Sequence, residues 1–167
     1  EGQRALANNS VAYKTKPEMG TFMREWLSLY DSKSGERGIF NRQSAIKQAA
    51  KNGRRDTEYD FGCNPCSEII LRPYQFCNLC EVNVSDVTDQ KDFNSRVKAA
   101  AFIGTLQAGY TEFHYLREIW QETTEKDALI GVSMTGIASA AVLPLDMKVA
   151  ASIVKRENTR VAKLIGI

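Results

Sequence analysis

Hydrophobic residues recur at helical spacing along much of this 167-residue chain. The clearest series follows an i, i+3, i+4, i+7 pattern on one face and consists of Met19, Phe22, Met23, Trp26, Leu27 and Tyr30. We expect that face to point at a core. The same spacing predicts helices over residues 18–30, 44–51, 92–106, 113–124 and 146–165. Asp92 is the expected cap of the third helix, because an aspartate accepts hydrogen bonds from the first-turn amides.

Short apolar runs between these helices predict strands, which we expect over residues 38–41, 69–71, 81–84 and 129–132. Residues 1–17 are polar and are predicted to be irregular. Strands that are short and apolar and that alternate with helices are typical of a parallel α/β arrangement. The sequence therefore predicts the α/β class.

Composition limits the classes of function. Hydrophobic residues make up 43% of the chain and charged residues 25%, and the net charge is only +2. This balance is that of a globular protein, and we expect no nucleic-acid partner. The uncharged stretch 128–145 is interrupted by glycines and a proline, so no membrane span is expected. The chain starts at Glu1 and stops after a long helical pattern, so we expect a fragment.

All four cysteines fall within eighteen residues: Cys63, Cys66, Cys77 and Cys80. Their C-x2-C-x10-C-x2-C spacing could supply four thiolates to a structural zinc ion. The ten-residue separation is shorter than the roughly 15–20 residues usual between paired zinc knuckles. A small zinc-binding interaction module is therefore one interpretation and separate redox-active thiols are the other. Without a secretory signal, either one favours a cytoplasmic location.

Asn64, Cys66 and Glu68 occupy alternate positions around the second cysteine. In an extended loop, alternate side chains point the same way, so an amide, a thiol and a carboxylate could converge on one hydroxyl-bearing ligand. The alternative is a turn in which Asn64 caps the backbone and Glu68 is solvated.

The string NPCSEI, followed by a cysteine in CNL, resembles the active-site loop of ribonucleotide reductases, in particular the adenosylcobalamin-dependent class. Four further segments are similar to landmarks of that family and occur in the family's order: LANNSVA, GIFNRQSA, CNLCEVNV and LIGVSMTGI. The resemblance covers nearly the whole chain. It implies a ten-stranded α/β barrel of the radical reductase type, of which residues 1–167 would be one partial catalytic domain, with the active-site loop at about 63–71.

The resemblance also implies roles for individual residues. Cys66 would become the thiyl radical that removes the 3′-hydrogen of a ribonucleotide, and Glu68 would take the proton of the 3′-hydroxyl. Asn64 would hydrogen-bond the ribose hydroxyls. Cys77 would be one of two thiols that reduce the 2′-carbon.

Asn9, Ser10 and Ser67 complete the implied substrate contacts, although a cap or turn is an equally good interpretation of Asn9 and Ser10. The implied cofactor is adenosylcobalamin. The implied partners are a ribonucleoside di- or triphosphate, a thioredoxin-type reductant and the remainder of the reductase chain.

This sequence also departs from the family pattern. The thiol that pairs with Cys77 lies far upstream in the family, and Cys63 and Cys80 match no family position, so Cys80 is expected to be a plain buried thiol. The chain is therefore predicted to be inactive alone. A nonfunctional gene fragment or one half of a split gene is a third interpretation.

Overall fold

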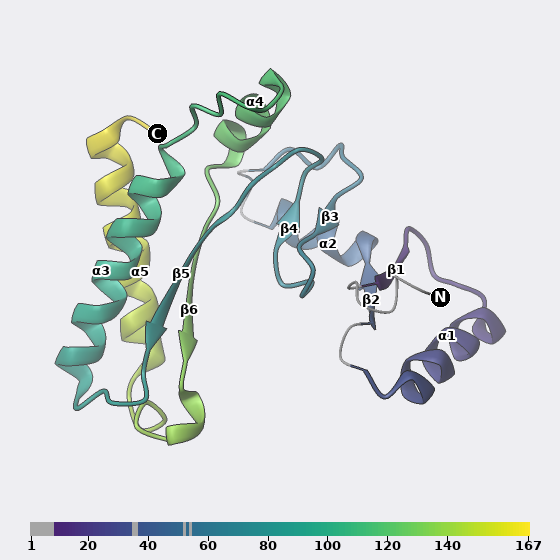
Figure 1. Cartoon of the computed structure of the whole chain (residues 1–167), viewed down its shortest axis with the longest axis horizontal. Helices are drawn as coiled ribbons and strands as arrows, with labels where there is room; N and C mark the ends of the chain where they lie inside the picture. The colour runs from purple at the N-terminus through teal and green to yellow at the C-terminus, as the bar shows by residue number, and fades with distance from the viewer. Residues whose placement is uncertain (1–8, 35–36, 52, 54) are drawn as a thin grey trace. The chain divides into compact units, whose positions relative to one another are not determined.

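The computed structural model describes residues 9–34, 37–51, 53 and 55–167, and it divides into two units, Glu1–Pro73 and Tyr74–Ile167. The first unit contains β1 (Asn9–Tyr13), α1 (Met19–Ser32), β2 (Arg37–Asn41), α2 (Arg42–Ala50), β3 (Gly62–Cys63) and β4 (Ile70–Leu71). The second contains β5 (Asn78–Asn83), α3 (Gln90–Ala108), α4 (Glu118–Asp127), β6 (Ile130–Thr135), the 3₁₀ turn η2 (Ile137–Ser139) and α5 (Met147–Ile165) (Figure 1).

Strands β1 and β2 of the first unit pair in parallel, from Asn9 opposite Arg37 to Tyr13 opposite Asn41. The predicted strand at 38–41 is thus confirmed, whereas the prediction that residues 1–17 are irregular is wrong for β1. Val11 and Tyr13 are partly buried and Ala12 between them is exposed, which is the alternation of a strand with one covered face. The run is too short for this alternation to stand out in the sequence.

Helix α1 begins where the sequence predicts. The Glu18 carboxylate accepts hydrogen bonds from the amides of Gly20 and Thr21 at 2.8 and 2.9 Å, and these bonds hold the pKa of Glu18 below its usual value. The expected packing of the helix is wrong, however, because no residue of α1 is buried and Trp26 is 55% exposed. Helical spacing identifies an apolar face but does not show what covers it.

In the second unit, β5 and β6 form a parallel pair, and α3 and α5 lie side by side along it (Figure 1). The core is made by residues that all point between the strand pair and the helices: Val82, Val84, Val87, Phe93, Val97, Ala100, Val142 and Ala150. The first turns of α3 and α5 are also joined, since the Gln90 side chain accepts from the Asp146 amide at 2.7 Å. Further along, Asn158 donates to the buried Thr105 hydroxyl at 3.0 Å.

The start of α3 corrects one prediction. Asp89, not Asp92, is the N-cap, and its carboxylate accepts from the Asp92 amide at 2.8 Å. Asp92 reaches back to accept from the Thr88 amide at 3.2 Å and also binds Arg96 at 2.9 Å, so its pKa lies below the usual value. Two carboxylates spaced three residues apart share the cap, as in a capping box.

Helix α4 begins at Glu118, five residues later than the helix predicted from residue 113. The segment before it is irregular apart from a short turn, and His114 there is exposed and lies 3.9 Å from Glu112. The last helix matches its prediction, with the Asp146 carboxylate capping the amides of Lys148 and Val149.

The described residues thus form a mixed α and β structure with three two-stranded sheets, two of them parallel. The ten-stranded barrel and the single catalytic domain stay predictions. Among the described helices, none is long and apolar enough to cross a membrane.

The core of the second unit generates a stability prediction. Phe93 is 1% exposed and Phe102, on the same helix, is 37% exposed. Phe93→Ala should lower the free energy of unfolding by about 3–5 kcal/mol, because it leaves a cavity between α3 and the strands. Phe102→Ala is the matched control and should cost about 1 kcal/mol or less. Urea denaturation of both variants measures the difference, and equal losses would contradict this account of the core.

Candidate functional site

The predicted active-site loop is the connection of a β-hairpin in the first unit. Strands β3 and β4 pair antiparallel, with Gly62 opposite Leu71 and Cys63 opposite Ile70 (Figure 1). The Asn64 amide donates to the Ile69 carbonyl at 3.2 Å and extends the pairing by one step. Residues 64–69 are therefore held at both ends.

Asn64 closes this loop with its side chain. Its Oδ1 accepts from the Ile69 amide at 3.0 Å, and its Nδ2 donates to Glu68 Oε1 at 2.6 Å. The structure therefore brings Asn64 and Glu68 together, as expected for a shared ligand. The predicted route is wrong, because the backbone between them turns and does not run extended. The capping role that the alternative gave to Asn64 is what the structure has.

The letters N-P-C-S encode the turn. The Ser67 amide donates to the Asn64 carbonyl at 3.0 Å, so Asn64 to Ser67 form a β-turn with Pro65 in the second position. Proline fixes the backbone angle that this position requires. Ser67 has a left-handed φ of 68°, which turns the chain back toward β4. Cys66 occupies the third position of the turn and is exposed.

The side chain of Cys63 stabilises this turn. Its thiol donates to the Ser67 hydroxyl at 3.5 Å, and both residues are partly buried. Ser67, a predicted substrate contact, is therefore engaged within the loop. Cys63, which matched no family position, has a structural contact that explains a thiol or another small polar group at this place.

Three arginines hold the base of the hairpin, and the sequence analysis missed all of them. Arg42 donates to the Phe61 carbonyl at 2.7 Å, and Arg55 donates to the Ile70 carbonyl at 2.9 Å. The Phe61 ring is fully buried, with the guanidinium of Arg55 at 4.7 Å and that of Arg72 at 5.5 Å from its centroid. Arg72 also lies 4.6 Å from the Tyr59 ring. Contacts between these cations and the faces of Tyr59 and Phe61 thus stabilise the base of the hairpin.

The other two cysteines belong to the second unit. Cys77 is partly buried and directly precedes β5. Cys80 lies on β5, and its Sγ would be 3.2 Å from a Cβ placed on Gly104 of α3. Cys80 packs against the core as expected, but it is partly buried and not fully buried. Because Cys77 and Cys80 are three residues apart on an extended segment, their side chains face opposite sides and do not form a zinc knuckle.

Asn9 and Ser10 lie on β1 and not in a cap or turn, and the residues that precede them in LANNSVA are outside the described part of the chain. Ser10 is exposed, and its Oγ would be 3.1 Å from a Cβ on the paired Gly38. A side chain at position 38 would therefore crowd the hydroxyl. Within each unit, no three described His, Cys, Asp or Glu side chains gather as a metal site requires.

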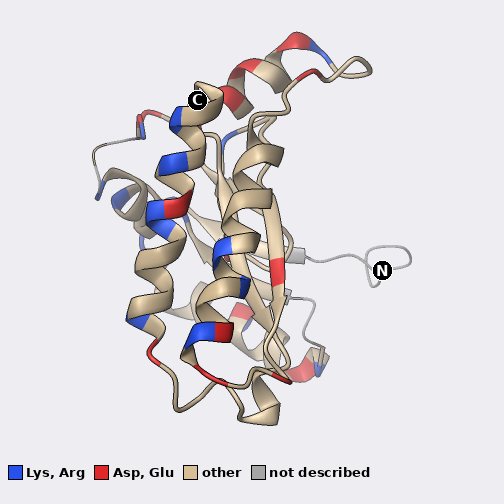
Figure 2. Ribbon diagram, turned by 90° about the vertical axis from the view of Figure 1, so that its left-hand side faces the viewer, with Lys and Arg blue, Asp and Glu red and all other residues tan. Residues whose placement is uncertain are grey.

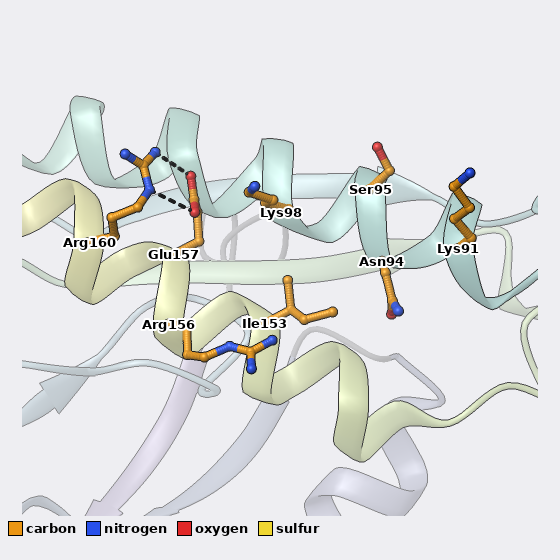
Figure 3. A pocket seen from close by; sticks show the side chains of 8 residues that line it. All are labelled: Lys91, Asn94, Ser95, Lys98, Ile153, Arg156, Glu157 and Arg160. Carbon is orange, nitrogen blue, oxygen red and sulfur yellow. Dashed lines mark hydrogen bonds and ion pairs between the residues drawn. The ribbon is translucent and has the colours of Figure 1, made fainter.

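A charged groove of about 460 Å³ runs between α3 and α5, lined by Lys91, Asn94, Ser95, Lys98, Ile153, Arg156, Glu157 and Arg160 (Figure 3). Basic residues predominate along these two helices, and each helix carries a single acidic residue, Asp92 on α3 and Glu157 on α5 (Figure 2). Glu157 is 6% exposed and binds Arg160 through both carboxylate oxygens at 2.7 and 3.1 Å, which together with Lys98 lowers the pKa of Glu157. The groove contains none of the predicted site residues.

Comparison with known proteins gives one informative similarity. The chain is 32% identical over 138 residues to the adenosylcobalamin-dependent ribonucleoside-triphosphate reductase of Lacticaseibacillus paracasei. The match covers 80% of this chain, and the chain spans 18% of the length of that protein. No protein-family model matches the chain. No solved structure matches it either. A stretch of a ribonucleotide reductase is thus a distant relative of this chain, which supports the resemblance seen in the sequence.

The loop geometry generates a second prediction. Asn64→Ala removes the acceptor of the Ile69 amide, so hydrogen exchange at that amide should accelerate by about two- to tenfold, the equivalent of one ordinary hydrogen bond. Glu68→Gln is the matched control, because it leaves the bond between Asn64 and Ile69 in place and should preserve protection. NMR-detected exchange measures both variants. Unchanged protection of Ile69 in Asn64→Ala would show that Asn64 does not close the loop.

Proposed function

We propose that this chain is a catalytic part of a ribonucleotide reductase, which reduces ribonucleotides to 2′-deoxyribonucleotides by thiyl-radical chemistry. One observation carries the proposal. The NPCSE segment folds as a closed turn that exposes Cys66 and pairs Asn64 with Glu68. The distant relationship to a ribonucleoside-triphosphate reductase supports the same function.

The loop offers the groups that this reaction needs. An exposed thiol on a tight turn can approach a substrate without competing side-chain bulk around it, and sulfur both gives up and regains a hydrogen atom. The Glu68 carboxylate has two oxygens, so one can accept from Asn64 while the other takes a proton. The hydrogen bond from Asn64 fixes that carboxylate in the same loop as Cys66, and a base that is held in place contributes more to a reaction than a mobile one.

The proposed sequence of steps follows from these groups. Cys66, as a thiyl radical, removes the 3′-hydrogen of the ribose and becomes a thiol. Glu68 accepts the proton of the 3′-hydroxyl, which assists departure of the 2′-hydroxyl as water after it takes a proton from a thiol. Cys77 and a second thiol outside this chain form the reducing pair, in which one thiol gives the proton that leaves with the water and the other gives its hydrogen atom to the 2′-carbon. The two sulfurs then join as a disulfide, while their remaining electron and the proton held by Glu68 pass to the 3′-carbonyl. Cys66 then returns its hydrogen atom to the 3′-carbon.

Adenosylcobalamin is the proposed cofactor, because the relative is named for it. When bound, it would supply the radical that Cys66 carries. The exposed Cys66 thiol fits this role, since the group that receives the radical must be reachable. We place the surface that holds the corrin ring in the remainder of the reductase chain. A thioredoxin-type reductant, which would restore the Cys77 thiol, and a cytoplasmic location are further parts of the proposal.

The decisive test is substitution of the cysteines in the complete protein. Cys66→Ser should abolish formation of deoxyribonucleotides, because a hydroxyl does not carry the radical. Cys80→Ser is the matched control and should retain most activity, since Cys80 only packs against α3. Chromatographic separation of ribo- and deoxyribonucleotides after incubation with cofactor and a dithiol measures both. Retained reduction in Cys66→Ser would overturn the assignment.

The cysteine spacing favours one rival function, a zinc-binding interaction module. Metal analysis of the purified chain distinguishes the two. One tightly held zinc ion per chain, lost in Cys63→Ser and in Cys80→Ser, would support the rival. The reductase proposal expects no stoichiometric zinc and no loss of folded structure on treatment with a chelator.

A further inference from the structure

The residues that directly precede Cys77 are tied to helix α4. Thr123 Oγ1 donates to the Tyr74 carbonyl, and the Phe76 amide donates to Thr124 Oγ1 at 3.3 Å. The two threonines are adjacent on α4 and both are buried. Side chains of one helix thus fix the backbone on both sides of position 75, across nearly fifty residues of sequence.

The side chain of Gln75 adds two further hydrogen bonds from this segment to α4. Its Nε2 donates to the Thr123 carbonyl at 3.0 Å and to Asp127 Oδ2 at 2.7 Å. Gln75 is 6% exposed and Asp127 is 2% exposed. Buried polar groups that satisfy one another in this way specify a single local arrangement, because any displacement leaves a donor or a carboxylate desolvated and unpaired.

Aromatic rings add an apolar layer over these hydrogen bonds. The Phe76 ring stacks on Trp120 of α4 at 4.8 Å between centroids and meets Phe113 edge to face at 5.2 Å. The Tyr74 ring meets Trp120 at 5.6 Å, and the Arg117 guanidinium lies 5.0 Å from the Tyr74 ring. Tyr74 and Phe76 therefore contact α4 through their side chains as well as through their backbones.

The residue after Cys77 is equally fixed. The amide and the side-chain Nδ2 of Asn78 both donate to the Leu129 carbonyl, at 3.0 and 3.1 Å. Leu129 directly precedes β6, two residues beyond the end of α4. With Phe76 and Asn78 both held, Cys77 has little backbone freedom.

We propose that α4 is a positioning element for Cys77 and that Gln75, Thr123, Thr124 and Asp127 are its positioning residues. The purpose of this positioning rests on the proposed function, in which Cys77 must meet the 2′-carbon of a bound ribonucleotide. A reducing thiol held in one place loses less entropy when it reacts than one on a mobile loop. We call the contacts of Tyr74, Gln75 and Phe76 with α4 the clamp at Cys77.

Thiol modification in this chain tests the clamp. In Gln75→Leu, the rate constant for alkylation of Cys77 by iodoacetamide should rise by about 5- to 30-fold, the effect expected when local opening becomes easier by one or two buried hydrogen bonds. Peptide mass spectrometry follows each cysteine separately. Cys80 in the same molecule is the internal reference, and its rate should stay within about twofold because α3 and β5 are untouched.

Two further variants make the result decisive. Gln121→Leu is the matched control, since Gln121 lies on α4 but bonds to Glu125 and not to the segment before Cys77, so its Cys77 rate should equal that of the original chain. Thr124→Val removes only the acceptor of the Phe76 amide and should raise the Cys77 rate alone. An unchanged Cys77 rate in both Gln75→Leu and Thr124→Val, or an equal rise at Cys77 and Cys80 in both, would overturn the proposal.

This experiment requires no turnover, so it separates the clamp from the reductase function. If Cys66→Ser retains activity while Gln75→Leu releases Cys77, the proposed function fails and the clamp stands. In the complete protein, Gln75→Leu should lower kcat with little change in KM, because Cys77 acts after the ribonucleotide has bound. A lower affinity with unchanged kcat would contradict the positioning role even if the alkylation rates agree with it.

Discussion

The parallel ladder between β5 and β6 is the constraint on which the second unit depends. Its register pairs Asn78 with Ile130 and continues to Asn83 opposite Thr135. Two strands alone are marginally stable, so the pair needs a cover, and α3 supplies it. The helix and the strand approach closely at Gly104, because a Cβ there would lie only 3.2 Å from Cys80 Sγ. The parallel direction also fixes where α4 must end. Since both strands start at the same edge, the residues before β5 lie beside Leu129, which precedes β6, and beside the last turn of α4 just before it.

The clamp at Cys77 is thus a consequence of topology and needs no sequence motif. In the first unit, by contrast, the shape of the turn is set by neighbouring residues in the sequence. Pro65 sets its second position, the Asn64 side chain closes it, and Ser67 reverses the chain in a left-handed conformation. What the local sequence does not supply is the base of the hairpin, where buried Phe61 is held by arginines from outside the loop, such as Arg55. Short-range turn chemistry shapes the loop, and long-range packing holds it in place.

The contrast between local signals and long-range packing explains how far the sequence could predict the structure. Helix α5 was predicted well because its cap, Asp146, and its apolar spacing are both local signals. Strand β1 was missed because five residues of weak alternation become a strand only through pairing with β2. Asn64 and Glu68 were expected to point the same way from an extended loop, whereas closure of a turn brings them into direct contact. No local signal marks Gln75 or Asp127, because a buried polar pair looks like two surface residues until the fold brings them together.

The four cysteines show most directly how structure separates residues that look equivalent in sequence. Cys66 is exposed on the turn, whereas the Cys63 thiol is bonded to Ser67 beneath it. Hydrogen bonds fix Phe76 and Asn78 on either side of Cys77. Cys80 packs against Gly104 of α3. A structural metal site needs four thiolates that converge, and an extended segment directs Cys77 and Cys80 to opposite sides. A radical reductase instead needs thiols with different tasks. An exposed thiol suits the exchange of a hydrogen atom, and a thiol with a fixed backbone suits attack at one carbon, so the unequal environments favour redox chemistry over metal binding.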